Sequence, residues 1–101
     1  MNVVLFHADV ANDLNEASRW YERQKPGLGR TFRDAFDEIL GRVVDSPLRF
    51  APVEEDLRCA RLRKFPYGIF YEHVRESVVV VYGVLHHSRD PELWRSRRSG
   101  C

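Results

Sequence analysis

A run of basic residues is the stretch of this sequence with the clearest capacity for chemistry. Arg58, Arg61, Arg63 and Lys64 precede the segment Phe65-Pro66-Tyr67. The loose alternation from Arg58 to Arg63 predicts a β-strand, in which residues two apart share a face. Arg61 and Arg63 are therefore expected to project together. Two planar guanidinium groups side by side suit a phosphate or a carboxylate partner.

The other face of this expected strand carries Ala60 and Leu62, two apolar residues that can pack against helices. Arg61 and Arg63 would then lie on an open face of the sheet. A second interpretation stays open, because charged side chains on an exposed strand also discourage aggregation between sheets.

Two adjacent histidines, His86 and His87, end the last expected strand and are followed by Ser88-Arg89. Neighbouring residues of a strand point to opposite faces, so the pair does not suit a shared metal site. No cluster with the spacing of zinc ligands occurs elsewhere, and neither a metal nor a cofactor is expected. One histidine beside arginines can act as a general acid or base in RNA cleavage, or it can simply pack at the strand end.

Cys59 and Cys101 are the two cysteines of the chain. A bridge between them would tie the last residue to the sheet, so both are expected to be free thiols in a reducing compartment. Cys59 is expected to be a buried structural thiol. Trp20 and Tyr21 are interpreted as core residues between helix and sheet.

The composition favours one folded domain over residues 1–101, since 44% of the residues are hydrophobic and 31% are charged. Met1 to Asp9 has no basic n-region and no long apolar h-region, so no signal peptide is expected, and the longest apolar run, Val78 to Leu85, is shorter than the roughly 18 residues of a membrane span. A cytoplasmic protein is expected.

The near-neutral net charge of the chain hides an asymmetry between its two halves. Up to Asp56 there are seven basic and eleven acidic residues, and after Asp56 there are nine basic and four acidic residues. Such a basic half often meets phosphates or an acidic protein.

The N-terminal half reads as one strand and two helices. Val3 to Phe6 predicts a short strand, and Asp9 is placed to cap the helix that follows. Apolar residues recur with helical spacing over two segments, which are separated by Lys25-Pro26-Gly27 and end at Ser46-Pro47. So short a link predicts an antiparallel helical hairpin. The apolar positions are Val10, Leu14, Ala17 and Tyr21 in the first helix and Phe32, Ala35, Phe36, Ile39, Leu40 and Val43 in the second.

The C-terminal half reads as a sheet. Residues 48–56 show no period and predict a loop, after which Arg58–Arg63, Tyr67–His73 and Val78–Leu85 predict a three-stranded antiparallel sheet. The valine run places the last strand inside the sheet. Asp90-Pro91 then opens a short helix. The expected fold is α+β, with the hairpin covering one face of the sheet and the other face open.

Several segments, in this order and spacing, resemble the RelE/ParE toxin superfamily, whose members are also known as plasmid stabilisation proteins. The resemblance covers nearly the whole chain, and the helical hairpin against a sheet is the fold of that superfamily. The segments are Ala11–Ala17 with Trp20-Tyr21, Pro26–Gly29 with Phe32, Pro47, Arg58–Arg63, Phe65–Tyr71, and Val84–Pro91 with Trp94.

The resemblance implies the toxin of a type II toxin–antitoxin pair, held inactive in a hetero-oligomer with a small antitoxin. The superfamily divides by mechanism. RelE-like members are endoribonucleases that cut mRNA on the ribosome with basic residues on the open sheet face. ParE-like members inhibit DNA gyrase and have lost much of that set.

Carried over residue by residue, the resemblance favours the ParE-like branch. Gly68 stands where many of the ribonucleases have an arginine that stabilises the scissile phosphate, and Trp94 falls about where some have a tyrosine, whose hydroxyl an indole lacks. We therefore expect a gyrase inhibitor that is not an enzyme, with the ribosome-dependent endoribonuclease as the alternative. The candidate catalytic residues for that alternative are Arg61, Arg63, His87 and Arg89. The candidate target-binding residues are Arg58, Arg61, Arg63, Tyr67, Arg89 and Trp94.

Overall fold

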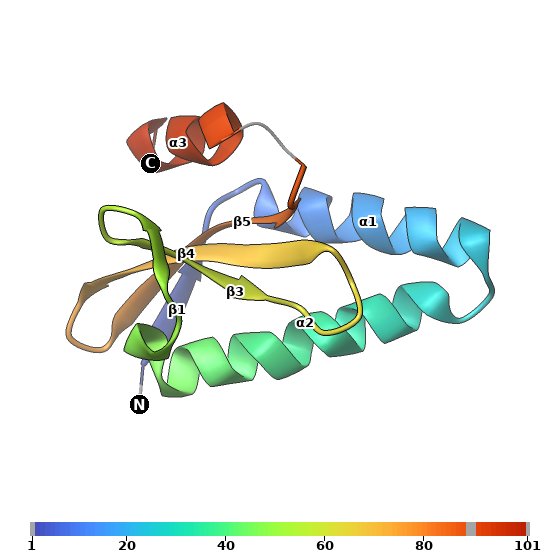
Figure 1. Cartoon of the computed structure of the whole chain (residues 1–101), viewed down its shortest axis with the longest axis horizontal. Coiled ribbons are helices and arrows are strands. Elements are labelled where there is room, and N and C mark those ends of the chain that lie inside the picture. The colour runs from blue at the N-terminus through green and yellow to red at the C-terminus, as the bar shows by residue number, and fades with distance from the viewer. Residues whose placement is uncertain (1, 89–90, 101) are drawn as a thin grey trace.

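The computed structural model describes residues 2–88 and 91–100, which contain three α-helices, one 3-10 helix and five strands. Figure 1 shows their arrangement in space. In chain order the elements are β1 (Val3–Phe6), α1 (Val10–Gln24), α2 (Leu28–Asp45), η1 (Pro47–Arg49), β2 (Pro52–Glu54), β3 (Leu57–Arg61), β4 (Tyr67–Arg75), β5 (Val78–His86) and α3 (Pro91–Gly100).

The described strands form one mixed sheet in the order β1-β5-β4-β3-β2. The expected three-stranded antiparallel sheet is therefore too small. β1 joins it as a parallel edge strand, with Val3 opposite Val78 and Phe6 opposite Val81. β5 lies inside the sheet between β1 and β4, as its valine run predicted.

Residues 48–56, expected to be a loop, contain most of η1 and the whole of β2. β2 is an edge strand paired with β3 through Pro52 opposite Arg58 and Glu54 opposite Leu57. Proline lacks an N–H and is tolerated in a sheet mainly at edges and strand starts, and Pro52 occupies both. A three-residue strand that begins with proline gives no readable period, which is why the sequence predicted a loop.

The helical hairpin packs on one face of the sheet, as expected. Val10 and Ala17 of α1 are buried, and α2 buries the phenylalanines and aliphatic residues of its apolar stripe. Ala60 and Leu62 meet the helices in the same core, which confirms the expected orientation of these two residues. The remaining faces of α1 and α2 are charged, and no helix in the described ranges is long and apolar enough to cross a membrane.

The link between the two helices is fixed by one carboxylate. Glu22 of α1 accepts hydrogen bonds from the backbone N–H groups of Gly27, at 3.0 Å, and of Gly29, also at 3.0 Å. These bonds lower the pKa of Glu22 and satisfy N–H groups at the start of α2 that have no partner within the helix. Gly27 has a φ of 89°, a conformation that favours glycine.

A third layer covers part of the opposite face of the sheet. α3 lies on the side away from α2 (Figure 1), and Trp94 stacks on Phe70 with ring centroids 5.8 Å apart. Leu57, Tyr82 and Leu85 complete this second, smaller core. The face that the sequence left open is therefore partly closed by α3.

Gly29→Ala and Gly41→Ala add the same methyl group to α2 with opposite expected effects. A Cβ at Gly29 would lie 2.6 Å from the carbonyl oxygen of Ser18, whereas a Cβ at Gly41 would meet nothing within 4 Å. Gly29→Ala should lower the free energy of unfolding by about 1–3 kcal/mol through overpacking. Gly41→Ala should raise it by up to about 1 kcal/mol through helix propensity. Urea denaturation measures both, and equal effects would contradict the close approach of α1 and α2 at Gly29.

Candidate functional site

A nearly buried ion pair fixes α3 against α1. The guanidinium of Arg97 donates from Nη1 to Asp13 Oδ2 at 2.6 Å and from Nη2 to Asp13 Oδ1 at 3.0 Å. The two side chains are only 10% and 8% exposed. A bidentate contact of this kind fixes both the distance and the orientation of the two elements.

The same pair is also bonded to β5. Asp13 Oδ2 accepts the N–H of Val84 at 3.1 Å, and Arg97 Nη1 donates to the carbonyl oxygen of Tyr82 at 3.2 Å. The residue between them has to be small, because a Cβ at Gly83 would lie 2.7 Å from Arg97 Nη1. Three elements therefore meet at this ion pair.

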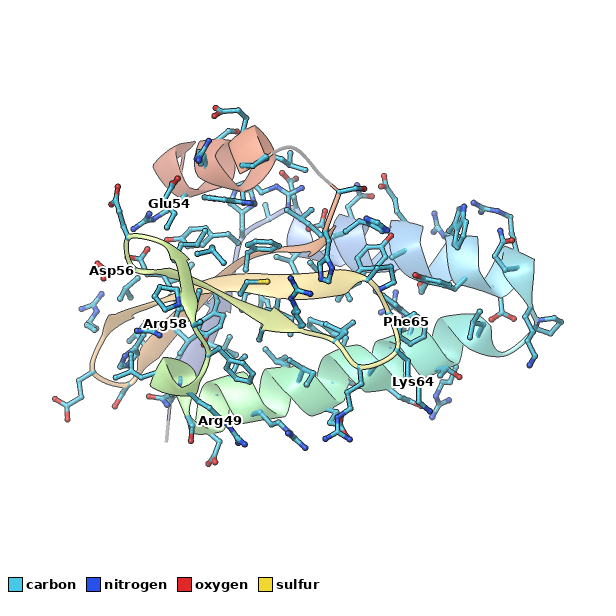
Figure 2. All side chains as sticks on the ribbon, viewed as in Figure 1. Arg49, Glu54, Asp56, Arg58, Lys64 and Phe65 are labelled. Carbon is cyan, nitrogen blue, oxygen red and sulfur yellow. The ribbon has the colours of Figure 1, made fainter. Side chains whose placement is uncertain are left out.

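Two further arginines of α3 bind carboxylates of the sheet. Arg95 Nη2 lies 2.6 Å from Glu54 Oε1 of β2, and Arg98 Nη2 lies 3.2 Å from Glu72 Oε2 of β4. Glu54 extends beneath α3 in Figure 2. The expectation that the basic half of the chain faces an acidic partner therefore does not hold for α3, whose arginines bind carboxylates of the same molecule.

Arg61 and His87 lie near each other at one end of the sheet. Arg61 is the last residue of β3, is exposed, and forms no ion pair with any residue that the structure describes. His87 follows β5, and its backbone N–H donates to the carbonyl oxygen of Pro66 at 2.9 Å. Desolvation lowers the pKa of the imidazole, and the nearby charge of Arg61 lowers it further. Both effects favour the neutral form of the imidazole.

Tyr67, at the start of β4, is half-buried, and its side chain lies on the face of the sheet that the helical hairpin covers, with its ring centroid 5.1 Å from that of Phe32. Its ring contacts the ring of His86 edge-on, with centroids 5.2 Å apart, and it packs against Tyr21 of α1 at 6.1 Å. Of the sequence-predicted site residues, the fold therefore brings together Arg61 and His87, whereas the ring of Tyr67 belongs to the core under the hairpin and only its backbone contacts the imidazole of His87.

Arg63 does not share a face with Arg61, so this expectation was wrong. β3 ends at Arg61, and the chain then bends through Lys64, which has a φ of 69°. Arg63 points toward α2, where its Nε lies 3.5 Å from Glu38 Oε1. The expectation assumed that the alternation of side chains in a strand continues to Arg63, but Arg63 lies two residues beyond the end of β3.

The remaining predicted site residues lie elsewhere. Arg58 is half-buried and donates from Nη1 to the carbonyl oxygen of Phe50. Trp94 is 7% exposed between Phe70 and the guanidinium of Arg95, so its ring is not open to a partner while α3 occupies this position. Arg89 lies outside the described residues.

The space above Gly68 is filled by a thiol. An ideal Cβ at Gly68 would lie 2.5 Å from Cys59 Sγ on the neighbouring strand. Burial raises the pKa of Cys59 to about 11, which keeps the thiol protonated, as a structural cysteine requires. Cys59 is a free cysteine, and Cys101 lies outside the described residues. Across residues 2–88 and 91–100, no three side chains of the metal-ligating types come together as a metal site requires.

A groove of about 700 Å³ that the sequence did not predict lies between α1 and the adjoining ends of β4 and β5, and is here called the α1 groove. Trp20, which was expected in the core, lines it and is 50% exposed. One signal was present, because Trp20 lies beside the helical stripe of Val10, Leu14, Ala17 and Tyr21 rather than within it. The residues that line the groove include Glu16, Arg19, Trp20, Arg23, Tyr67 and His86.

The fold, a helical hairpin on a mixed sheet with a C-terminal helix on the other face, is that of RelE/ParE-type toxins. It is similar to a solved chain from the chromosomal ParDE TA system of P. aeruginosa, with a TM-score of 0.72 at 13% sequence identity, over 85% of this chain and 96% of that one. Residues 4–91 match the family model for the ParE toxin of the type II toxin–antitoxin system parDE. The chain belongs to this ParE toxin family. No curated protein sequence gives a significant match.

The ion pair of Asp13 and Arg97 should contribute far more to stability than the exposed pair of Glu54 and Arg95. Asp13→Asn leaves a nearly buried guanidinium without its counter-charge, and should lower the free energy of unfolding by about 3–5 kcal/mol. Glu54→Gln changes an exposed pair and should have little effect. Urea denaturation of both variants measures the contrast. The double change Asp13→Asn/Arg97→Met removes both charges and should be less destabilised than Asp13→Asn alone; a larger loss would contradict this account.

Removing the charge of Arg61 should raise the pKa of His87. Arg61→Gln takes away a cation that disfavours the imidazolium, whereas the partial desolvation of the ring, which is the larger cause, persists. The pKa should therefore rise but stay below its ordinary value. An NMR titration of the imidazole measures it. Arg63→Gln is the control, because that guanidinium faces Glu38 and should not affect His87. An unchanged pKa of His87 in Arg61→Gln would show that the charge of Arg61 does not act on this imidazole.

Proposed function

We propose that this chain is a toxin that inhibits DNA gyrase, without cutting RNA, and that a cognate antitoxin neutralises it. The observation that carries the choice of target is the absence of a side chain at Gly68, where Cys59 occupies the space that a phosphate-binding group would need. Cleavage of RNA develops negative charge on the phosphate, and an enzyme must meet that charge with fixed donors. A protonated thiol does not supply a positive charge.

The positions of two other residues, Arg63 and Trp94, also support gyrase as the target. Arg63 is directed to Glu38, so the two adjacent guanidiniums expected on one face are reduced to Arg61 alone. Trp94 is buried between α3 and the sheet and has no hydroxyl to transfer a proton. The exposed surface that remains suits recognition of a protein more than catalysis on a phosphate.

A ribosome-dependent endoribonuclease is the second candidate function, and one observation favours it. His87 lies near Arg61 and its lowered pKa favours the neutral form, so its imidazole can accept a proton while the guanidinium binds a phosphate. Arg61 and His87 would then be the two side chains that carry RNA cleavage, one as the phosphate ligand and the other as the general base.

An antitoxin partner follows from the family, in which toxins and antitoxins form pairs. We place the protein in the cytoplasm, where gyrase and the ribosome are both found. The complex with the antitoxin is proposed to be a hetero-oligomer that covers the target-binding residues.

The two candidate functions predict different damage in cells and in purified systems. Pulsed expression of this chain should arrest growth, induce the DNA-damage response and inhibit supercoiling by purified gyrase. Co-expression of the adjacent gene should restore growth. Cuts in mRNA at defined codon positions within minutes, with normal supercoiling, would establish the endoribonuclease instead.

Single substitutions sharpen this test. Arg61→Ala should weaken gyrase inhibition about tenfold, as the loss of one charged contact does, whereas Arg63→Ala should change little because Arg63 faces α2. His87→Ala should leave inhibition nearly intact, since a general base contributes roughly 10²- to 10⁴-fold to a rate only where a proton is transferred. Circular dichroism confirms that each variant is folded. Loss of toxicity in His87→Ala with full toxicity in Arg61→Ala would contradict the proposal.

A further inference from the structure

The α1 groove holds a half-exposed tryptophan in a concave surface. Trp20 lies on the wall formed by α1, and Pro66, Val84 and Leu85 contribute to the opposite side. The indole touches Tyr21 edge-on at 5.0 Å, but half of the residue stays in contact with water. Tryptophan in a concave site is enriched among the residues that dominate binding energy between proteins.

The cations beside Trp20 differ from those of α3. Arg19 and Arg23 line the groove, and neither forms an ion pair or a side-chain hydrogen bond with the residues that the structure describes. The carboxylate of Asp13 at the end of the groove is already bonded to Arg97. Glu16 accepts a hydrogen bond from Asn12 at 3.1 Å and is the other acidic residue of the lining.

This combination determines the chemistry of the partner. The apolar wall and the exposed indole gain most from an apolar side chain, because burying an aromatic surface removes a large area from water. The two arginines at the rim gain from carboxylates. A nucleic acid strand is less suitable, since Glu16 lies three residues before Arg19 on α1, lines the same groove and would repel its phosphates.

We infer that the α1 groove is the docking site of an acidic segment of the antitoxin, whose apolar side chain packs on Trp20 and whose carboxylates meet Arg19 and Arg23. The inference rests on the proposed function, because it requires an antitoxin. A segment seated there also reaches Tyr67 and His86, which line the same groove beside His87. Occupation of the groove therefore covers one side of the surface proposed to meet the target.

Charge reversal in the groove separates neutralisation from toxicity. Arg19→Glu/Arg23→Glu should remain toxic when expressed alone, because neither arginine belongs to the proposed target-binding set, but the adjacent gene should no longer rescue growth. The control Arg30→Glu/Arg75→Glu makes the same change of charge at two exposed residues that do not line the groove. It should be toxic and fully rescued.

Each other outcome has a defined meaning. Rescue of Arg19→Glu/Arg23→Glu to the level of the control would overturn the inference and leave the proposed function intact. A folded Arg19→Glu/Arg23→Glu protein that has lost toxicity would place the groove in contact with the target and also overturn it. A wild-type chain without toxicity would overturn the proposed function, and the inference with it.

A binding measurement tests the apolar half of the inference. Trp20→Ala should raise the dissociation constant for the purified product of the adjacent gene by about 30-fold, as expected for a tryptophan at the centre of an interface. Trp20→Phe should recover part of the affinity. Val53→Ala removes a residue of similar exposure on β2, outside the groove, and should have no effect. Equal affinities of the wild-type chain and Trp20→Ala would overturn the inference.

Discussion

The bidentate contact between Asp13 and Arg97 determines where the third layer of this protein lies. Without it, α3 would be attached to the sheet by one small apolar cluster, one exposed ion pair and one partly buried ion pair. The contact also depends on Gly83, since any larger residue would separate the guanidinium from β5. A charge pair shielded from water is costly to form and costly to break, so it acts mainly by selecting one position for the helix.

The position of α3 in turn decides which cations remain at the surface. Its arginines neutralise carboxylates of α1, β2 and β4, and Trp94 fills the second core. Arg61 and His87 stay exposed at one end of the sheet, and Arg19 and Arg23 stay exposed along α1. Two surfaces with separate chemistry result, and both border on the groove between helix and sheet.

Local patterns predicted much of this fold, whereas contacts between residues distant in sequence could not be predicted. The spacing of apolar residues within each segment is enough to predict the helices α1 and α2 and the strands β4 and β5. The partner of β1, the edge strand β2 and the acidic partners of the α3 arginines depend on which distant segments meet. Arg63 was misplaced because the residues that follow β3 continue its alternation although the strand has ended. A stripe of apolar residues indicates which face is buried, but not that Trp20 would line a groove.

The parallel pairing of β1 with β5 has a consequence for the order in which the molecule assembles. β1 is synthesised more than 70 residues before its partner strand β5, and the contact between Asp13 and Arg97 spans 84 positions. Contacts of such long range form late and slow the folding of small domains. A nascent chain can complete the helical hairpin early, but its sheet and third layer must wait until residue 97 has left the ribosome. Any activity that needs the finished surface therefore begins only after Arg97 has been synthesised and has reached Asp13.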